Sequence, residues 1–222
     1  MTKIAVVTGA AGGMGQAICR RMIEEGFSVI GLDMTWPDGT LFDTAVFRAV
    51  TGDLSDDRAV AEIFDGIATR EGHVDVLVNN AGTCFMSDFP EIPAEEFRRQ
   101  MAVNFDTCFH CCQAAIPLML GGKGVRKIIN ISSNGAYNFD VFDPPHYRAS
   151  KAAMDTLTKD LARRYATEKI AVNSIAPAMT QTPLFNVLSE ETLAKAVAAM
   201  PHGTAMQPDQ IAAWVAFLAG PG

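Results

Sequence analysis

Short apolar runs rich in β-branched residues alternate with longer amphipathic stretches along the chain. A continuous apolar run of strand length is typical of a strand buried on both faces, whereas helical spacing of apolar residues indicates a helix with one buried side. The runs predict strands near residues 3–8, 27–32, 46–50, 74–79, 125–131 and 169–175. The amphipathic stretches predict helices over about 13–25, 55–70, 93–120, 146–167 and 207–219. This alternation predicts an α/β fold with a parallel sheet covered on both faces.

The 222 residues contain no internal repeat, low-complexity tract or linker, which predicts one domain over residues 1–222. The connection from Asp33 to Phe47 carries a turn signal around Pro37. The segment 182–200 reads as one helix or two, entered through Pro183. Because it leaves the carboxyl end of a strand, we expect it to form a lid over the site.

Composition narrows the classes of partner. A hydrophobic share of 49% with 19% charged residues is typical of a soluble globular protein. The net charge of −7 argues against nucleic acid or an anionic membrane as the main partner. The first apolar run is too short for a signal peptide or a membrane span, and the cysteine count is odd at 5. Reduced thiols in a cytoplasmic protein are therefore expected.

Three of the cysteines, Cys108, Cys111 and Cys112, flank His110 in a stretch full of Phe, Ala, Ile and Leu. A metal site is one interpretation of this group. However, adjacent cysteines point in different directions on a helix, and cysteine is a common small core residue. We expect core packing and no metal.

The segment Tyr147-Arg-Ala-Ser-Lys151 sets a phenol and an ammonium four residues apart. On a helix these positions share one face. A lysine near a tyrosine favours the phenolate and lowers the tyrosine pKa, which suits a general acid/base. The spacing alone also fits an ordinary helix with one aromatic and one solvated charge, so other features must support it.

A glycine-rich turn follows the first predicted strand directly and opens the first helix, with Gly9, Gly13, Met14 and Gly15. Glycines there let the backbone approach a pyrophosphate, whose charge faces the helix N-terminus. Asp33 ends the second strand about 20 residues further on, where a carboxylate accepts hydrogen bonds from the ribose hydroxyls and repels a 2′-phosphate. This pattern predicts NAD rather than NADP. A tight βα turn and a solvated aspartate are the plainer alternatives.

Taken in this order, the motifs resemble the short-chain dehydrogenase/reductase family in its single-domain form, and the resemblance spans residues 1 to about 220. The matching segments are Asp53-Leu54, Asn79-Asn80-Ala81-Gly82, Asn104 in Met-Ala-Val-Asn-Phe, Ile129 to Ser133, and Asn173 to Pro177 followed by Thr180 and Thr182. The resemblance implies a Rossmann-type doubly wound sheet and hydride transfer between NAD and a secondary alcohol or ketone.

The resemblance also assigns roles. It implies catalysis by Asn104, Ser133, Tyr147 and Lys151, with Asn104 helping to hold a water beside the lysine. The residues expected to contact the cofactor are Gly9, Gly13, Met14, Gly15, Asp33, Asp53, Leu54, Asn80, Ala81, Gly82, Tyr147, Lys151, Pro177, Thr180 and Thr182. Those expected to contact substrate are Ser133, Asn134, His146, Tyr147 and Met179, with Thr83, Cys84, Phe139 and 184–188 as further wall positions.

Several features depart from the family pattern. Ala178 stands where glycine is usual, and the Asp-, Phe- and Pro-rich link from Gly135 to His146 leaves Ser132 as an alternative to Ser133. His146, next to the tyrosine, reads as a substrate contact or as a solvated or capping residue. The chain ends before the family's last strand and tail, so we expect a sheet without that strand.

Three functions remain open. The leading hypothesis is an NAD-dependent alcohol dehydrogenase acting on a small or medium hydrophobic alcohol. A ketoacyl-thioester reductase is the second, although it expects NADP and a basic docking surface. A regulatory NAD-binding protein is the third, although its catalytic positions would be expected to decay. The resemblance also implies a homodimer or homotetramer, formed through the helices at 93–120 and 146–167.

Overall fold

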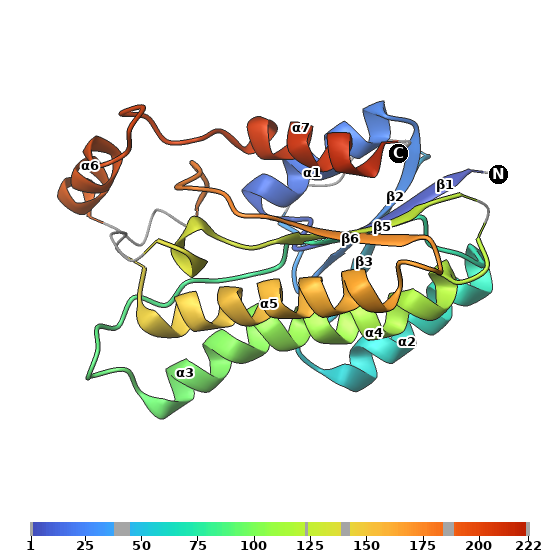
Figure 1. Ribbon diagram of the computed structural model, residues 1–222, viewed down its shortest axis with the longest axis horizontal. Coiled ribbons are helices and arrows are strands. Elements are labelled where there is room, and N and C mark those ends of the chain that lie inside the picture. Colours follow the sequence, from blue (N-terminus) through green and yellow to red (C-terminus); the bar gives the residue numbers. More distant parts are fainter. Residues whose placement is uncertain (1, 38–44, 123, 139–142, 184–188, 221–222) are drawn as a thin grey trace.

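Six parallel strands form one sheet in the order β3-β2-β1-β4-β5-β6 (Figure 1). The computed structural model describes residues 2–37, 45–122, 124–138, 143–183 and 189–220. The strands are β1 (Lys3–Thr8), β2 (Phe27–Asp33), β3 (Phe47–Thr51), β4 (Val76–Asn79), β5 (Arg126–Ile131) and β6 (Ile170–Ile175). This order is that of a doubly wound sheet, whose strand order reverses between β1 and β4.

Helices cover both faces of the sheet (Figure 1). On one side lie α1 (Gly13–Glu24) and α7 (Pro208–Ala219). On the other lie α2 (Asp57–Arg70), α4 (Thr107–Met119) and α5 (Pro145–Arg164). The shorter elements are α3 (Ala94–Met101), a π-helical turn η1 (Ala102–Asp106), a 3₁₀ turn η2 (Asn134–Ala136) and α6 (Glu190–Ala198).

The first strand shows why its sequence is apolar at almost every position. Ile4 and Val6 pack into the core under α2, α4 and α5, whereas Ala5 and Val7 pack into the core under α1 and α7. Successive side chains of a strand point to opposite faces, so a strand covered on both sides needs apolar residues throughout. The predicted α/β single-domain fold is confirmed, and no helix among the described residues is long and apolar enough to cross a membrane.

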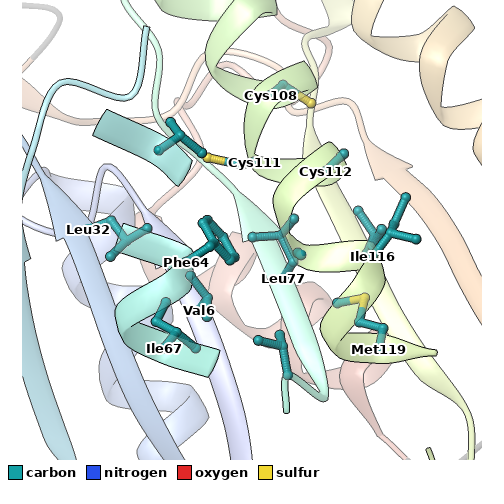
Figure 2. Packing of buried hydrophobic residues seen from close by; sticks show 14 of the residues in the cluster. Val6, Leu32, Phe64, Ile67, Leu77, Cys108, Cys111, Cys112, Ile116 and Met119 are labelled. Carbon is teal, nitrogen blue, oxygen red and sulfur yellow. The ribbon is translucent and has the colours of Figure 1, made fainter. Parts of the chain in front are cut away.

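The cysteines of α4, Cys108, Cys111 and Cys112, belong to the larger core, which Figure 2 shows together with Leu77 and Phe64. These three side chains are at most 2% exposed, and all five cysteines of the chain are free thiols. No group of metal-ligating residues occurs among the described residues. The prediction that these cysteines pack in the core is therefore confirmed.

The predicted helix over 93–120 is wrong as one continuous element. It is divided into α3, η1 and α4, with the π-helical turn over Ala102–Asp106. A π turn inserts an extra residue into the helical ladder and is frequent at functional sites. Here Asn104 lies in the turn and is fully buried. The periodicity of apolar residues does not reveal such an insertion, because the helix on either side keeps its spacing.

Candidate active site

The glycine turn between β1 and α1 requires glycine for two separate reasons. Gly9 has φ +64°, and a Cβ on it would lie 2.8 Å from Ala81 Cα. A Cβ on Gly15 would lie 2.0 Å from the carbonyl oxygen of Gly9. Both contacts are with backbone atoms, which cannot move aside. The turn is therefore folded too tightly for any side chain at these two positions.

This turn forms one wall of a cleft of about 430 Å³ at the carboxyl ends of the strands, beside the reversal point of the sheet. Of the predicted cofactor contacts, the following line it: Gly9, Gly13, Met14, Gly15, Asp33, Asp53, Leu54, Asn80, Ala81 and Gly82. The sequence missed Thr35, Val103, Thr107 and Pro183, which also line it. They come from loops and helices whose place at the cleft depends on the folded chain.

Asp33 is held in one orientation at the end of β2. Its Oδ2 accepts a hydrogen bond from Ala11 N at 2.9 Å, and its Oδ1 accepts one from Met34 N at 2.8 Å. A carboxylate has about four acceptor positions, so each oxygen keeps a free one. Asp33 therefore presents two further acceptor positions at the cleft. The plainer interpretation, a freely solvated loop aspartate, does not fit these two bonds.

Tyr147 lies in the first turn of α5 beside two other predicted catalytic residues. Its hydroxyl shares a hydrogen bond with Ser133, and Lys151 Nζ lies 6.0 Å from the centre of its ring. A Cβ on Gly82 would lie 3.3 Å from Lys151 Nζ and 3.3 Å from Asn104 Oδ1. None of the four predicted catalytic residues lines the cleft itself, but Gly82 does, so the fold brings the four together beside one end of it.

The predicted lowering of the Tyr147 pKa is not found in this structure. Burial raises the pKa of Tyr147; the hydrogen bond from Ser133 opposes the shift, and the charge of Asp143 adds to it. Lys151 is itself buried, and burial lowers its pKa to about 8. Its ammonium donates to the carbonyl oxygen of Ile131 at 2.8 Å. In a pocket shielded from water, burial of the phenol has a larger effect on the Tyr147 pKa than the lysine four residues away, on which the prediction relied.

Asn104 uses its side chain mainly to hold the loop after β4. Its Oδ1 accepts from Thr83 N at 2.8 Å, and its Nδ2 donates to Thr83 O and Ser150 Oγ, each at 3.0 Å. Both amide hydrogens are thereby used, which leaves a single acceptor position on Oδ1. Gln100 supports the same loop, since Nε2 donates to Thr83 O at 2.8 Å and Oε1 accepts from Phe85 N at 2.9 Å.

Ser132 and Ser133 point to different partners. Ser132 Oγ donates to Asp155 Oδ2 at 2.7 Å, and both residues are buried. Ser133 Oγ accepts from Gly135 N at 3.1 Å and faces Tyr147. This geometry favours Ser133 over Ser132 as the residue beside the reacting atoms. Asp155, which is 4% exposed and raises the pKa of Lys151, was missed by the sequence, although it lies one turn beyond the lysine on the same helical face.

The loop after β6 runs beside the glycine turn and the serine segment. Asn134 N donates to Pro177 O at 2.8 Å, and a Cβ on Gly13 would lie 3.5 Å from Thr182 Cβ. Thr180 is buried and donates to Ala178 O at 3.0 Å, and Met179 O accepts from Met206 N. The loop is thus placed between the cleft and the serine segment. Phe139 and residues 184–188 lie outside the described part of the chain.

The interpretation of His146 as a solvated or capping residue is wrong. The residue is 2% exposed, and its Nε2 lies 3.1 Å from Glu96 Oε1. The helix instead begins after Pro144, which offers no side-chain cap. Helix α3 packs along α5 and covers the imidazole, which the sequence around position 146 cannot indicate. Contact of His146 with substrate stays a prediction.

A doubly wound sheet with this turn and this group of residues defines an oxidoreductase of the dinucleotide-binding class. Comparison with known proteins identifies the family. The family model described as short chain dehydrogenase matches residues 3–193. The chain therefore belongs to the short-chain dehydrogenase/reductase family, whose members use nicotinamide cofactors and act on small molecules.

Individual relatives match over nearly the whole chain. An acetoacetyl-CoA reductase of Acinetobacter sp. (strain RA3849) is 34% identical over 97% of this chain and 90% of its own. A meso-2,3-butanediol dehydrogenase of Serratia marcescens is 32% identical over 98% of this chain and 87% of its own.

Among solved structures, ligand-free Thermoplasma acidophilum aldohexose dehydrogenase is similar with a TM-score of 0.88 at 31% identity, covering 99% of this chain and 87% of its own. The Pseudomonas aeruginosa RhlG/NADP active-site complex is similar with a TM-score of 0.89 at 28% identity, covering 98% of this chain and 89% of its own.

Proposed function

We propose that this protein is an NAD-dependent oxidoreductase that interconverts a secondary alcohol and a ketone, with Tyr147 as general acid/base. The observation that carries the proposal is the convergence at one end of the cleft. Ser133 hydrogen-bonds Tyr147, and Lys151 Nζ lies near both the tyrosine ring and Gly82. A proton-transfer group beside a cleft with a glycine turn for a dinucleotide phosphate is what such a reaction requires.

The cleft fits a dinucleotide and favours NAD. The glycine turn leaves space that any Cβ would fill, and the N-terminus of α1 faces a phosphate placed there. Asp33 offers free acceptor positions to the ribose hydroxyls. No lysine or arginine occurs between Asp33 and Arg48, and Arg48 pairs with Glu71 at 2.8 Å. A 2′-phosphate would therefore meet a carboxylate, and no lysine or arginine occurs among the described residues that line the cleft.

When bound, the nicotinamide supplies the hydride acceptor or donor. Tyr147 takes the hydroxyl proton during oxidation and returns it to the carbonyl during reduction. Ser133 holds the reacting oxygen through a hydrogen bond. The Lys151 ammonium lowers the free energy of the phenolate, against the effect of burial. The free acceptor position on Asn104 Oδ1 holds a water through which the proton reaches solvent.

A ketoacyl-thioester reductase is the second candidate, and the relative named acetoacetyl-CoA reductase favours it. Two observations weigh against it. The cleft favours NAD over NADP, and the two adjacent arginine pairs that could offer a basic docking surface, Arg98-Arg99 and Arg163-Arg164, are partly engaged. Arg164 Nε lies 3.4 Å from Asp160 Oδ2, and Arg99 stacks over Phe85 at 5.5 Å. A regulatory NAD-binding protein is the third, although it would not require the Ser133–Tyr147 hydrogen bond.

We further propose that 182–200 acts as a lid, since Pro183 lines the cleft and α6 follows it along the chain. A homodimer or homotetramer is supported by the exposed aromatic side chains Phe97 and Phe109 on α3 and α4, and Trp214 and Phe217 on α7. Light scattering of the purified protein tests the assembly. A cytoplasmic location agrees with five free thiols.

The function is tested by Tyr147→Phe, which removes the phenol with little change of shape. We expect turnover of secondary alcohols with NAD to fall by at least about 10²-fold while NADH affinity changes little. Fluorescence titration of NADH and a screen of alcohols measure both. Substantial residual turnover in the variant contradicts the role of Tyr147. Tight NADH binding by the wild-type protein without turnover of any alcohol favours the regulatory function instead.

A further inference from the structure

A carboxylate that the proposed reaction does not use lies beside the catalytic residues. Asp143 precedes α5 and is partly buried. A Cβ on Gly135 would lie 2.1 Å from Asp143 Oδ2, so the carboxylate lies directly against the Gly135 backbone. The N–H of Gly135 in turn donates to Ser133 Oγ at 3.1 Å. The carboxylate is therefore next to the serine that bonds Tyr147.

Asp143 has no evident structural task that explains this position. Helix α5 takes Pro144 as its N-cap and has no side-chain cap. Arg148 Nε donates to the backbone carbonyl of Asp143 at 2.7 Å, not to its carboxylate. Within the described ranges of the chain, no group donates a hydrogen bond to either carboxylate oxygen. A partly buried carboxylate without a protein donor takes its hydrogen bonds from water or from a ligand, so it can accept one from a bound substrate.

The same carboxylate interacts electrostatically with residues on the predicted substrate side of the site. Burial raises the pKa of Asp143, against the effect of Arg148. The charge of Asp143 raises the pKa of Tyr147 and also that of Cys84, a predicted wall residue. The groups that face Asp143 are thus Tyr147, Cys84 and Arg148. The negative charge raises the pKa of the general base, and a positive or hydrogen-bonding group on the substrate would offset this effect in addition to Arg148.

We propose that Asp143 is a specificity-determining residue that accepts a hydrogen bond from a second donor on the substrate, next to the reacting hydroxyl. The preferred substrates are then vicinal diols, polyols or amino alcohols rather than plain alcohols or hydroxy acids. A neighbouring hydroxyl or ammonium satisfies the carboxylate, whereas a carboxylate on the substrate meets like charge in a site of low dielectric. This inference rests on the proposed alcohol oxidation and deepens it.

The test compares substrates that share one carbon skeleton. The probes are sec-butanol, the vicinal butanediol, the matching vicinal amino alcohol and β-hydroxybutyrate, each with saturating NAD. Wild-type kcat/KM is expected to be about 10- to 100-fold higher for the diol and the amino alcohol than for sec-butanol, as for a hydrogen bond to a charged group. β-Hydroxybutyrate is expected to be the poorest of the four.

Two variants at this position separate charge from hydrogen bonding. Asp143→Asn keeps an acceptor but removes the charge, so it should lose most of the preference for the amino alcohol and gain activity on β-hydroxybutyrate. Asp143→Leu removes both and should turn over the diol and sec-butanol about equally. Asp160→Asn, at an exposed site on α5, is the matched control and should change no ratio. NADH affinity reports folding, because Asp143 does not line the dinucleotide cleft.

The outcomes distinguish the two levels of the proposal. Three results overturn the role of Asp143 and leave the proposed alcohol oxidation unaffected. They are equal wild-type kcat/KM values for the diol and sec-butanol, a wild-type preference for β-hydroxybutyrate, and kcat/KM ratios between substrates that are unchanged in both Asp143 variants. Absence of turnover for every probe in the wild-type protein, with NADH still bound, overturns the alcohol oxidation and this inference with it.

Discussion

Replacing Asp33 by asparagine tests how the cleft selects its cofactor. Both carboxylate oxygens of Asp33 accept a backbone N–H, from Ala11 at 2.9 Å and from Met34 at 2.8 Å. An amide has only one oxygen. In either orientation of the introduced amide, its NH₂ group therefore faces one of these two N–H groups. The variant loses the negative charge and also breaks a backbone hydrogen bond.

The size of the effect follows from these contacts. A hydrogen bond from a ribose hydroxyl to a charged acceptor contributes about 1.5–3 kcal/mol. Losing it weakens NADH binding by about 10- to 150-fold. NADPH gains instead, because its 2′-phosphate no longer meets a carboxylate, by an amount of about 1 kcal/mol at a solvated site. The preference for NADH over NADPH should thus fall by at least about 10-fold.

Fluorescence titrations with NADH and NADPH measure this preference in the wild-type protein and in Asp33→Asn. Asp53→Asn is the matched control. Asp53 also lines the cleft, but its Oδ1 is engaged by Ser55 N at 2.9 Å and Ser55 Oγ at 2.7 Å. The control should affect both cofactors alike. A wild-type protein that prefers NADPH, or a preference that is unchanged in Asp33→Asn, refutes the reasoning.

Two further predictions concern the lysine and the glycine turn. Because the pKa of Lys151 is lowered to about 8, its ammonium is present below this pH and lost above it. Since Lys151 is a predicted cofactor contact, NADH affinity should decline as the pH rises through about 8. Asp155 raises the pKa of Lys151, so in Asp155→Asn the decline of NADH affinity should begin at lower pH. NADH titrations of the wild-type protein and the variant, at pH values below and above about 8, measure this shift. Coinciding pH profiles of the two proteins would contradict the role of Asp155. Gly15→Ala places a Cβ 2.0 Å from a carbonyl oxygen and should cost about 1–3 kcal/mol of unfolding free energy together with NADH binding. Gly66→Ala is the control, because the space around its Cβ position in α2 is open, and it should leave stability and NADH binding intact or stabilise the fold slightly. Equal thermal unfolding temperatures for Gly15→Ala and Gly66→Ala would show that glycine is not required in the tight turn.

The sequence predicted the six strands well because each is buried on both faces and therefore apolar at successive positions. Val6 and Val7 show this, since adjacent residues enter opposite cores. It failed at the π-helical turn around Asn104, which an uninterrupted periodicity conceals. It also failed at His146, whose burial depends on Glu96 of another helix. Residues whose environment comes from distant segments leave no local signal in the chain.

The sequence by itself determined the order of the elements, the glycine turn, the acid at the end of β2 and the tyrosine–lysine pair, because each depends on spacing along one short segment. Only the tertiary structure decided which serine bonds Tyr147, that Asp143 lies against Gly135 beside it, and that burial raises the tyrosine pKa. These features depend on exposure to water and on contacts between β5, α5 and the loop that joins them. Desolvation and long-range contact are properties of the packed chain, and a linear spacing does not contain them.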